Sequence, residues 1–295
     1  MSYLPIALLS YFLNSIALTV DKFLLTKSIP DPLIYIFYFS LVSFLLTLAI
    51  PFTHIPSFTV FILSSTSTLA WTVGAYCMFR ALKYGQVQRV IPVIGTVTPL
   101  VLLIFAAGSN SIDLKQTEGI ILSVIGLVFL TLGDLKGKLA WDELILEISS
   151  GFFFALAYFL LRLAFLQDSF FTVLVWSRPI LIPLGIILLM IPASRNKILP
   201  MLHPRGVIQK AAPVFIFGQI AAGTSELLLT FSISLTNPAV VNSLQGIKYI
   251  YLLIFSLILG KKYPEIFKTK LSGYFLLSQI VGIAFIGLGL YLLAI

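Results

Sequence analysis

The sequence has few charged residues. Asp, Glu, Lys and Arg make up 10% of its 295 residues, whereas 59% of the residues are apolar. A soluble domain is roughly a quarter charged, because its surface faces water. The mean hydropathy is +1.06. These values exclude a soluble globular protein and a disordered low-complexity chain, and they predict a protein embedded in a membrane.

Cysteine and histidine are also scarce. The single cysteine, Cys77, lies in an apolar run and cannot form an internal disulfide. His54 and His203 lie in expected loops without acidic neighbours at the spacing of metal ligands. No nucleophile motif or phosphate-binding loop occurs either. We therefore expect no enzyme activity, no metal and no other cofactor.

The net charge of +8 comes largely from Lys and Arg in short loops between apolar runs. In a membrane protein such residues set the orientation of the chain. We therefore expect no nucleic-acid partner.

Ten apolar runs are separated by clusters of Pro, Gly, Asp or Lys, and each is long enough, or nearly so, to cross about 30 Å of hydrocarbon as a helix. Lipid offers the backbone no hydrogen-bond partner, so helices are expected rather than strands. The expected fold class is an all-α polytopic membrane protein with ten transmembrane helices. They cover residues 4–20, 33–50, 58–79, 90–107, 117–133, 144–161, 170–191, 211–235, 239–259 and 271–293.

The second half of the chain repeats the pattern of the first. Residues 123–133 read SVIGLVFLTLG and residues 279–289 read QIVGIAFIGLG, while LLIF occurs at 102–105 and again at 252–255. Two matches in the same order indicate a duplicated unit of five helices. A unit with an odd number of helices enters the membrane upside down in its second copy.

The two expected repeats are residues 1–138 and 139–295, and the loop charges support their inversion. The loops after odd-numbered helices hold fifteen Lys and Arg residues, and those after even-numbered helices hold two. Basic loops favour the cytoplasmic side. This count therefore predicts a protein of the cell (inner) membrane with cytoplasmic odd-numbered loops and both termini outside.

The chain resembles the EamA family of the drug/metabolite transporter superfamily over essentially its whole length. The resemblance rests on FRALKYGQVQ at 79–88 before a helix with Pro99, on the weaker echo FSISLTNPAVVNSLQG at 231–246, and on the glycines of the fifth and tenth helices. It implies ten helices in two inverted five-helix repeats. It also implies a central cavity among helices one, three, four, six, eight and nine.

This sequence departs from the family pattern in places. Tyr249 stands where a second proline would match Pro99, and the acidic residue usual after the fourth helix is not evident. The resemblance implies that both termini lie inside, whereas the loop charges predict that both lie outside. Both orientations are kept as alternatives.

Glu226 is the one acidic residue near the middle of an expected helix, because the other ten lie at helix ends or in loops. A lone ionised carboxylate in hydrocarbon costs at least a few kcal/mol, so Glu226 should face the interior of the bundle. Lys248 and Arg178 are the basic residues at comparable depth. A contact between Glu226 and Lys248 would be either a functional pair or a structural ion pair.

Polar residues form one stripe on each of two neighbouring expected helices, at helical spacing. Two such stripes predict a wet cavity between the helices. The stripes are Gln219, Gly223, Glu226 and Thr230, and Asn242, Gln245, Lys248 and Tyr249. The predicted substrate-binding set is Glu226, Lys248, Gln245, Asn242 and Arg178, with Asn14, Trp71 and Tyr76 as secondary members and Thr96, Thr98 and Trp176 as further candidates.

Structural roles compete with these assignments. The alternative for Arg178 is a side chain that reaches the membrane interface, and the alternative for Trp71 and Trp176 is packing or contact with lipid. Asn14 has the alternative of a hydrogen bond between helices. Pro92 and Pro99 predict a kinked fourth helix, either as a hinge or as an inherited bend.

Small residues four apart occur in the fifth and tenth helices, at Gly119 and Ser123 and at Ser278 and Gly282. This spacing allows helices to approach closely. Packing within one chain is favoured over dimerisation.

Together these patterns predict a secondary transporter that moves a small polar metabolite by alternating access. An amino acid or a small organic anion is favoured as substrate, and Glu226 is the candidate proton site. One alternative is an exchanger of nucleotide-sugars or phosphorylated solutes. Another is a structural or lipid-modifying membrane protein that transports nothing. The expected partners are the bilayer, the substrate and, in a coupled carrier, protons; the chain is expected as a monomer or homodimer.

Overall fold

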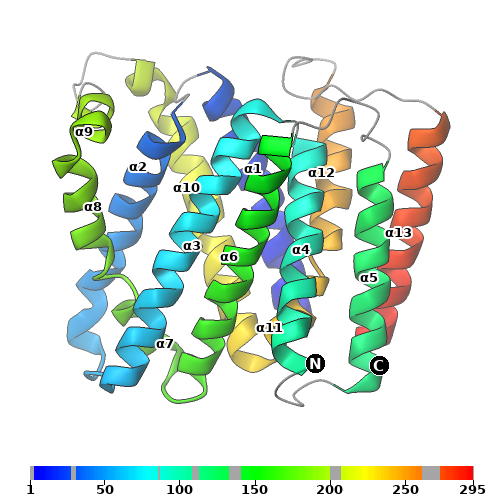
Figure 1. Cartoon of the computed structure of the whole chain (residues 1–295), viewed down its shortest axis with the longest axis horizontal. Helices are drawn as coiled ribbons and strands as arrows, with labels where there is room; N and C mark the ends of the chain where they lie inside the picture. Colours follow the sequence, from blue (N-terminus) through cyan, green and yellow to red (C-terminus); the bar gives the residue numbers. More distant parts are fainter. Residues whose placement is uncertain are drawn as a thin grey trace.

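The computed structural model describes residues 3–27, 31–85, 87–107, 113–132, 141–199, 207–260 and 273–294. These residues form helices and turns, with no strand among them (Figure 1). The helices are α1 (Tyr3–Lys27), α2 (Pro32–Phe44), the 3₁₀ helix η1 (Leu45–Phe52), α3 (Phe58–Tyr84), α4 (Val87–Ala107), α5 (Leu114–Leu132), α6 (Trp141–Phe165), α7 (Phe170–Trp176), α8 (Leu181–Met190), α9 (Pro192–Ile198), α10 (Val207–Leu235), α11 (Pro238–Ser243), α12 (Gly246–Leu259) and α13 (Gly273–Ala294).

Many of these helices have the length and composition of membrane spans. Among the described residues, seven segments are long and apolar enough to cross a bilayer, and α4 and α13 contribute the shorter apolar helices Val90–Ala106 and Leu277–Leu293. The chain is therefore a polytopic helical membrane protein. The seven segments are Tyr3–Thr26, Pro32–Phe52, Phe58–Tyr84, Trp141–Phe165, Phe170–Met190, Ala212–Leu235 and Pro238–Leu259.

Short polar side chains begin several helices. Asp31 accepts a hydrogen bond from the N–H of Leu33, and Ser57, Ser169 and Asn237 accept corresponding bonds at the starts of α3, α7 and α11. Each of these side chains satisfies a backbone donor that the first turn of a helix leaves unpaired. The loops between apolar runs therefore contain the signals that start the next helix.

Two of the expected helices are interrupted. Residues 170–191 form α7 and α8, separated by the turn at residues 177–180, where Pro179 has no N–H to donate. Residues 239–259 belong to α11 and α12, separated by Leu244 and Gln245. The expected helix 33–50 also changes character, because α2 tightens into η1.

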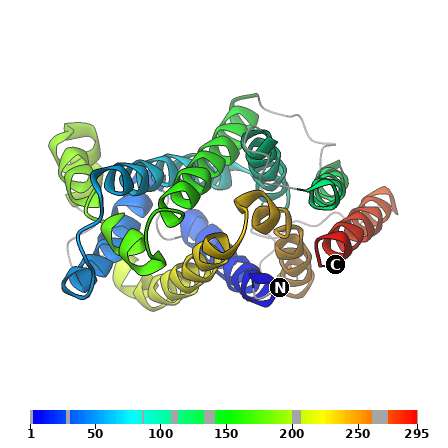
Figure 2. The same ribbon diagram turned by 90° about the horizontal axis from the view of Figure 1, so that it is seen from below.

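Three antiparallel helix pairs form the framework of the bundle: α3 with α6, α1 with α10, and α5 with α13 (Figures 1 and 2). In the first pair, Ser150 Oγ donates a hydrogen bond to the Gly74 carbonyl at 2.9 Å. In the second, Ser10 Oγ donates to the Ser225 carbonyl at 2.8 Å, and Ser225 Oγ donates to the Ser10 carbonyl at 2.9 Å. Small residues thus allow close backbone approach in both pairs.

Glycines bring α5 and α13 together at one edge of the bundle (Figure 2). A Cβ atom on Gly126 would lie 2.6 Å from the Gly282 carbonyl oxygen, and a Cβ on Gly282 would lie 2.8 Å from that of Gly126. A Cβ on Gly289 would clash with Ser123 Oγ. The small residues of the fifth and tenth expected helices therefore pack against each other within the chain.

The first and last helices meet at one end of the bundle. Tyr3 Oη donates a hydrogen bond to the Leu293 carbonyl at 3.1 Å, and Figure 1 shows both chain ends on that side. The proposed boundary between residues 138 and 139 and the histidine at position 203 lie outside the described residues.

An ion pair outside the spans fixes α9 to the start of α2. Lys197 Nζ lies 2.8 Å from Asp31 Oδ2. Partial burial opposes ionisation of Asp31, but the hydrogen bonds from Lys197 and from the Leu33 N–H together lower the pKa of its carboxyl group. The same contact raises the pKa of Lys197.

Candidate functional site

Two adjacent cavities inside the described part of the bundle contain the predicted carboxylate and cations. Cavity 1 has a volume of about 370 Å³ and is lined by α2, η1, α3, α6, α7, α10 and the turn between α7 and α8. Cavity 2 is narrower, about 90 Å³, and is lined by α1, α2, α3, α4, α6, α10, α11 and α12. Trp71, Tyr158, Gln219 and Glu226 line both cavities, so the two spaces share a wall.

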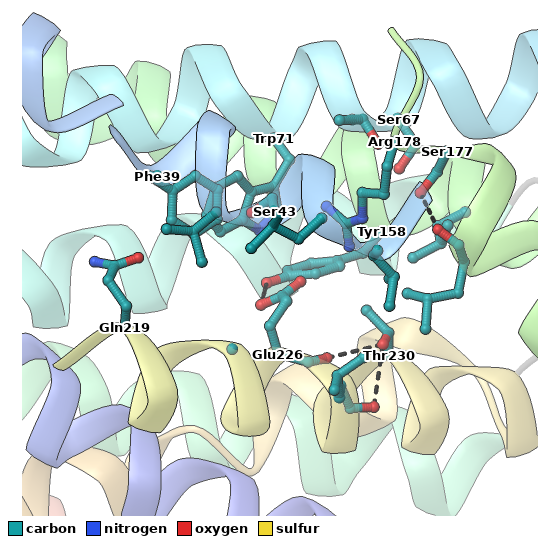
Figure 3. A pocket seen from close by; sticks show the side chains of 18 residues that line it. Phe39, Ser43, Ser67, Trp71, Tyr158, Ser177, Arg178, Gln219, Glu226 and Thr230 are labelled. Atoms are coloured by element: carbon teal, nitrogen blue, oxygen red, sulfur yellow. Dashed lines mark hydrogen bonds between the residues drawn. The ribbon is translucent and has the colours of Figure 1, made fainter. Parts of the chain in front are cut away.

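Glu226 extends from α10 toward α6 at this shared wall (Figure 3). Its Oε2 lies 3.5 Å from the hydroxyl of Tyr158, which donates to it. Glu226 forms no ion pair with any residue that the structure describes. A buried carboxylate without a paired cation is costly, so this position calls for hydration, protonation or a bound cationic group.

Arg178 lies in the turn where α7 ends and α8 has not yet begun. Its side chain points into cavity 1 toward Tyr158 and Glu226 (Figure 3). Arg178 Nε is buried and has no hydrogen-bond partner among the described residues. The side chain thus lies at the cavity rather than reaching for an interface, and it leaves a cationic donor free for a ligand.

Two aromatic rings form an apolar surface of cavity 1. The ring of Trp71 stacks on that of Phe39 with centroids 4.8 Å apart and planes 21° apart. Both rings line the cavity (Figure 3). Trp71 Nε1 is buried without a hydrogen-bond partner in the described part of the chain. Cavity 1 therefore combines one cation, one carboxylate and a flat apolar wall.

Glu226 and Lys248, whose contact the sequence left open, form no ion pair with each other. Both side chains line cavity 2, but Lys248 Nζ donates to Gln245 Oε1 at 3.4 Å and lies 5.4 Å from the Tyr249 ring centroid. The break between α11 and α12 leaves the Gln245 side chain free to accept the ammonium group. That ammonium is also 6.0 Å from the ring centroid of Tyr11.

The other polar residues of α11 and α12 are engaged in packing. Gln245 Nε2 donates to the Gly95 carbonyl at 2.9 Å, and Tyr249 Oη donates to the Ile91 carbonyl at 2.8 Å. Asn242 Nδ2 donates to the Pro238 carbonyl of its own helix. The bonds from Gln245 and Tyr249 attach the broken helix to α4, and Gln245 and Asn242 still line cavity 2.

The secondary candidates divide between the cavities and the packing around them. Asn14 and Thr98 line cavity 2. Tyr76 is half-buried, and Thr96 donates to the Pro92 carbonyl; neither lines cavity 1 or cavity 2. Trp176 also lies outside both, because its Nε1 donates to Thr53 Oγ1 at 3.0 Å.

Several residues of the site were not expected from the sequence. Asp21 lies within α1 and lines cavity 2, and Glu147 is buried within α6, so Glu226 is not the only carboxylate inside a helix. Tyr11 and Tyr158 line cavity 2 together with Asp21 and Glu226, whereas Glu147 lines neither cavity. A signal for Asp21 existed, since it continues the face of Asn14 and Leu18 on α1.

No group of three or more metal-ligating side chains occurs within the described residues. Outside the cavities, His54 Nε2 lies 2.8 Å from Asp168 Oδ1, and Thr172 Oγ1 lies 3.3 Å from His54 Nδ1. His54 thus has an acidic partner that is distant in sequence. This cluster joins the segment before α3 to the start of α7.

Comparisons with known proteins identify the fold alone. No family model and no curated protein matches the chain. A solved structure described only as "Crystal structure of protein" matches with a TM-score of 0.60 and 14% sequence identity, over 97% of this chain and 93% of that one. The two chains are therefore similar in fold along nearly their whole lengths.

Proposed function

We propose that the chain is a secondary transporter of the cell (inner) membrane that moves a small polar metabolite by alternating access. In this proposal ten transmembrane helices form two inverted five-helix repeats, as in the EamA family. One observation carries the proposal. Arg178, at the break between α7 and α8, and Glu226, on α10, face the same cavity without forming an ion pair with each other. Opposite charges held apart in this way suit a solute that bridges them.

Repeated contacts support the inverted repeats. In the proposed repeats α1 corresponds to α6 and α3 corresponds to α10, so the pair α3–α6 corresponds to the pair α10–α1. In each pair a serine hydroxyl, of Ser150 or of Ser10, donates to a backbone carbonyl of the other helix. The corresponding helices α1 and α6 run in opposite directions in Figure 1. Inverted repeats in transporters have this relationship.

The pair α5–α13 supports the same symmetry, because the repeats place equivalent residues opposite each other. Phe129 and Phe285 occupy matching places in the two glycine-bearing motifs, and their rings stack 5.6 Å apart with an interplanar angle of 8°. Gly126 and Gly282 match as well, and each lies against the other's carbonyl. Equivalent residues meet in this way on a two-fold axis.

The interrupted helices support transport. In many transporters, substrate sites lie at discontinuous helices whose unwound backbone borders a cavity. Here one break holds Arg178 and the other holds Gln245, and each residue lines a cavity. Irregular backbone at membrane depth is tolerated where it is buried in protein or lines such a space.

The charges favour a zwitterionic or anionic solute, such as an amino acid or a small organic anion. Arg178 would bind a carboxylate of the solute, and Glu226 would bind its ammonium group or a proton. Proton coupling follows if protonation of Glu226 favours one of the two access states over the other. Glu226 also lines cavity 2, which is the route that such a proton would take.

Two alternatives are less well supported. A nucleotide-sugar or phosphorylated solute calls for several cations, whereas Arg178 and Lys248 are the cations that line these two cavities within the described residues. A structural or lipid-modifying protein without transport calls for a dry, filled interior. Volumes of about 370 and 90 Å³ beside buried charges argue against that.

The test is transport in proteoliposomes. The wild type, Glu226→Gln and the matched control Glu118→Gln, whose glutamate is exposed at the start of α5, are challenged with amino acids and small organic anions with and without a pH gradient. We expect gradient-driven uptake of at least one solute by the wild type and the control, and its loss in Glu226→Gln. Gradient-driven uptake retained in Glu226→Gln contradicts the proton role of this residue.

A further inference from the structure

We propose that Asp21 is a second proton-binding carboxylate of this carrier and that it exchanges protons with Glu226 through the water-filled cavity 2. The proposal rests on the transport function above and adds a site to it. The two carboxylates extend from different helices, α1 and α10, and both line cavity 2. Asp21 is only 5% exposed, so its carboxyl group meets water chiefly inside the bundle.

The surroundings of Asp21 supply hydrogen bonds but no counter-charge. The hydroxyl of Tyr35, from α2, donates a hydrogen bond to Asp21 Oδ1. Gln219, from α10, donates to the same hydroxyl at 3.5 Å. Asp21 forms no ion pair with any residue in the described part of the chain.

The basic residue next to Asp21 is occupied elsewhere. Lys22 Nζ donates to the Leu82 and Gly85 carbonyls at 2.6 and 2.8 Å, at the end of α3. The walls of cavity 2 from α3 and α4 near this end are the apolar side chains of Met78, Phe79 and Ile91. A buried carboxylate in this setting is stabilised by binding a proton.

The remaining ionisable groups of cavity 2 belong to other parts of its wall. They are Tyr11 on α1, Tyr158 on α6, Glu226 on α10 and Lys248 on α12. Lys248 is bonded to Gln245, and Tyr11 donates to the Val241 carbonyl at 2.8 Å. Glu226 is thus the other carboxylate of this cavity that is free to exchange a proton.

Cavity 2 has the dimensions of a short water file. Ser10 and Asp21 both line it, and they are separated by about 16 Å along the axis of α1 at a rise of 1.5 Å per residue. The cavity therefore extends at least this far along α1. Gln219, the α10 residue nearest to Asp21 in the hydrogen-bond chain, is about 10 Å from Glu226 along α10. A volume of about 90 Å³ holds roughly three waters.

The proposed step is a simple proton transfer. The carboxylic acid of Glu226 releases a proton to the water file, and the carboxylate of Asp21 takes one up from it. The charge of the cavity is unchanged overall, but the negative charge moves from Asp21 to Glu226. Glu226 is then ionised beside cavity 1, where a cationic group of the solute binds, and Asp21 is neutral.

A purely structural role would make Asp21 a link between α1 and α2 through Tyr35. The two roles differ in what the carboxyl group does as pH changes. A structural link stays ionised and bonded over the working range, whereas a proton site gains and loses a proton. Asp21→Asn keeps an oxygen that accepts from Tyr35 and removes the ability to titrate. Tyr35→Phe does the reverse.

The test is infrared difference spectroscopy of the purified protein in lipid nanodiscs as pH is lowered, without any substrate. We expect two carboxylic-acid C=O bands from buried groups in the wild type. Asp21→Asn should lose one, Glu226→Gln the other, and each single variant should shift the titration midpoint of the remaining band. Tyr35→Phe should keep both bands and change the frequency of the Asp21 band, because its carboxyl group loses a hydrogen bond.

Two outcomes overturn the proposal. If Asp21→Asn gives the wild-type spectrum, Asp21 binds no proton. If the Asp21 band is lost but the Glu226 band keeps its midpoint, the protonation states of the two carboxylates are not coupled, and the paired proton site proposed here is ruled out. Should Asp21→Asn fail to fold, the band frequency in Tyr35→Phe identifies the Asp21 proton by itself. Absence of transport by the wild type defeats the proposed function separately, because the spectra need no substrate.

Discussion

Lys22 and Arg162 make the same interaction at opposite ends of the bundle. Lys22, near the end of α1, donates to the Leu82 and Gly85 carbonyls where α3 ends. Arg162, near the end of α6, donates to the Ile233 and Ser234 carbonyls where α10 ends, at 3.1 and 2.6 Å. In Figure 1 the ends of α1 and α3 lie at one side of the bundle, and the ends of α6 and α10 lie at the opposite side. In each case a cation satisfies the last carbonyls of a neighbouring helix.

These contacts, which we call the Lys22 latch and the Arg162 latch, connect helices of different tightly packed pairs. We expect Lys22→Met to open cavity 2 from the end of α3 and Arg162→Met to open it from the end of α10. Hydrogen bonds from a charged donor contribute about 1.5–3 kcal/mol, so an opening rate should rise at least about tenfold. The measurement is thiol labelling of Met78→Cys and Leu229→Cys, which line cavity 2, in a Cys77→Ser background. Each latch variant should accelerate one reporter; equal acceleration of both by either variant would contradict this.

Substitution of Arg178 should weaken the binding of anionic solutes. Its guanidinium group offers a planar, bidentate donor, which lysine does not. We expect Arg178→Lys to weaken the apparent affinity for carboxylate-bearing solutes by about tenfold or more, and Arg178→Met to weaken it further. Uptake assays in proteoliposomes measure this, with Arg195→Lys as control, because Arg195 is exposed on α9. Unchanged affinity in Arg178→Met would remove this residue from the site.

The contact of α5 with α13 should be sensitive to a single methyl group. A Cβ on Gly282 would lie 2.8 Å from the Gly126 carbonyl oxygen, whereas a Cβ on Gly287, five residues later on the same helix, would meet nothing within 4 Å. We expect Gly282→Ala to destabilise the protein by about 1–3 kcal/mol, because the helices must separate. Gly287→Ala should leave stability unchanged or raise it slightly. Thermal unfolding in detergent compares them, and equal melting temperatures would refute the close approach.

The Asp31–Lys197 pair predicts a small acid-dependent loss of stability. The pKa of Asp31 is lowered in the folded protein, so its stabilising effect is present above the unfolded value of about 3.9 and is lost as pH falls through the folded pKa. Both partners are partly exposed, so the effect should stay below about 1 kcal/mol and weaken with salt. Asp31→Asn keeps the helix cap and removes the charge. Its unfolding temperature should be lower than that of the wild type at pH 7 and equal to it near pH 2; a constant difference would contradict the pairing.

The sequence predicted the helices better than their interruptions. Hydropathy and length located the apolar segments, because lipid imposes both. It did not locate the breaks at Arg178 and Gln245, since a short turn inside an apolar run leaves the mean hydropathy unchanged. Those turns are held by tertiary bonds, such as that from Gln245 to the Gly95 carbonyl, which the local sequence does not contain.

The candidate site was predicted in part for the same reason. Glu226 and Arg178 were visible because a charge within an apolar run is rare. Asp21 was placed at a helix end, but α1 continues to Lys27, and the partners that bury this residue, Tyr35 and Gln219, come from other helices. The sequence left open whether Lys248 contacts Glu226; in the structure its ammonium group donates to Gln245 on the neighbouring turn.

The bond between Tyr3 and Leu293 joins the beginning and the end of the described chain. Because these two residues are close together, a short linker could join α13 to α1, and the chain could be opened at another loop instead. A circular permutant that begins after α5, with a short linker from α13 to α1, would present the second half first and keep every helix contact described above. Synthesis order and membrane insertion order would then be reversed in a protein of the same architecture.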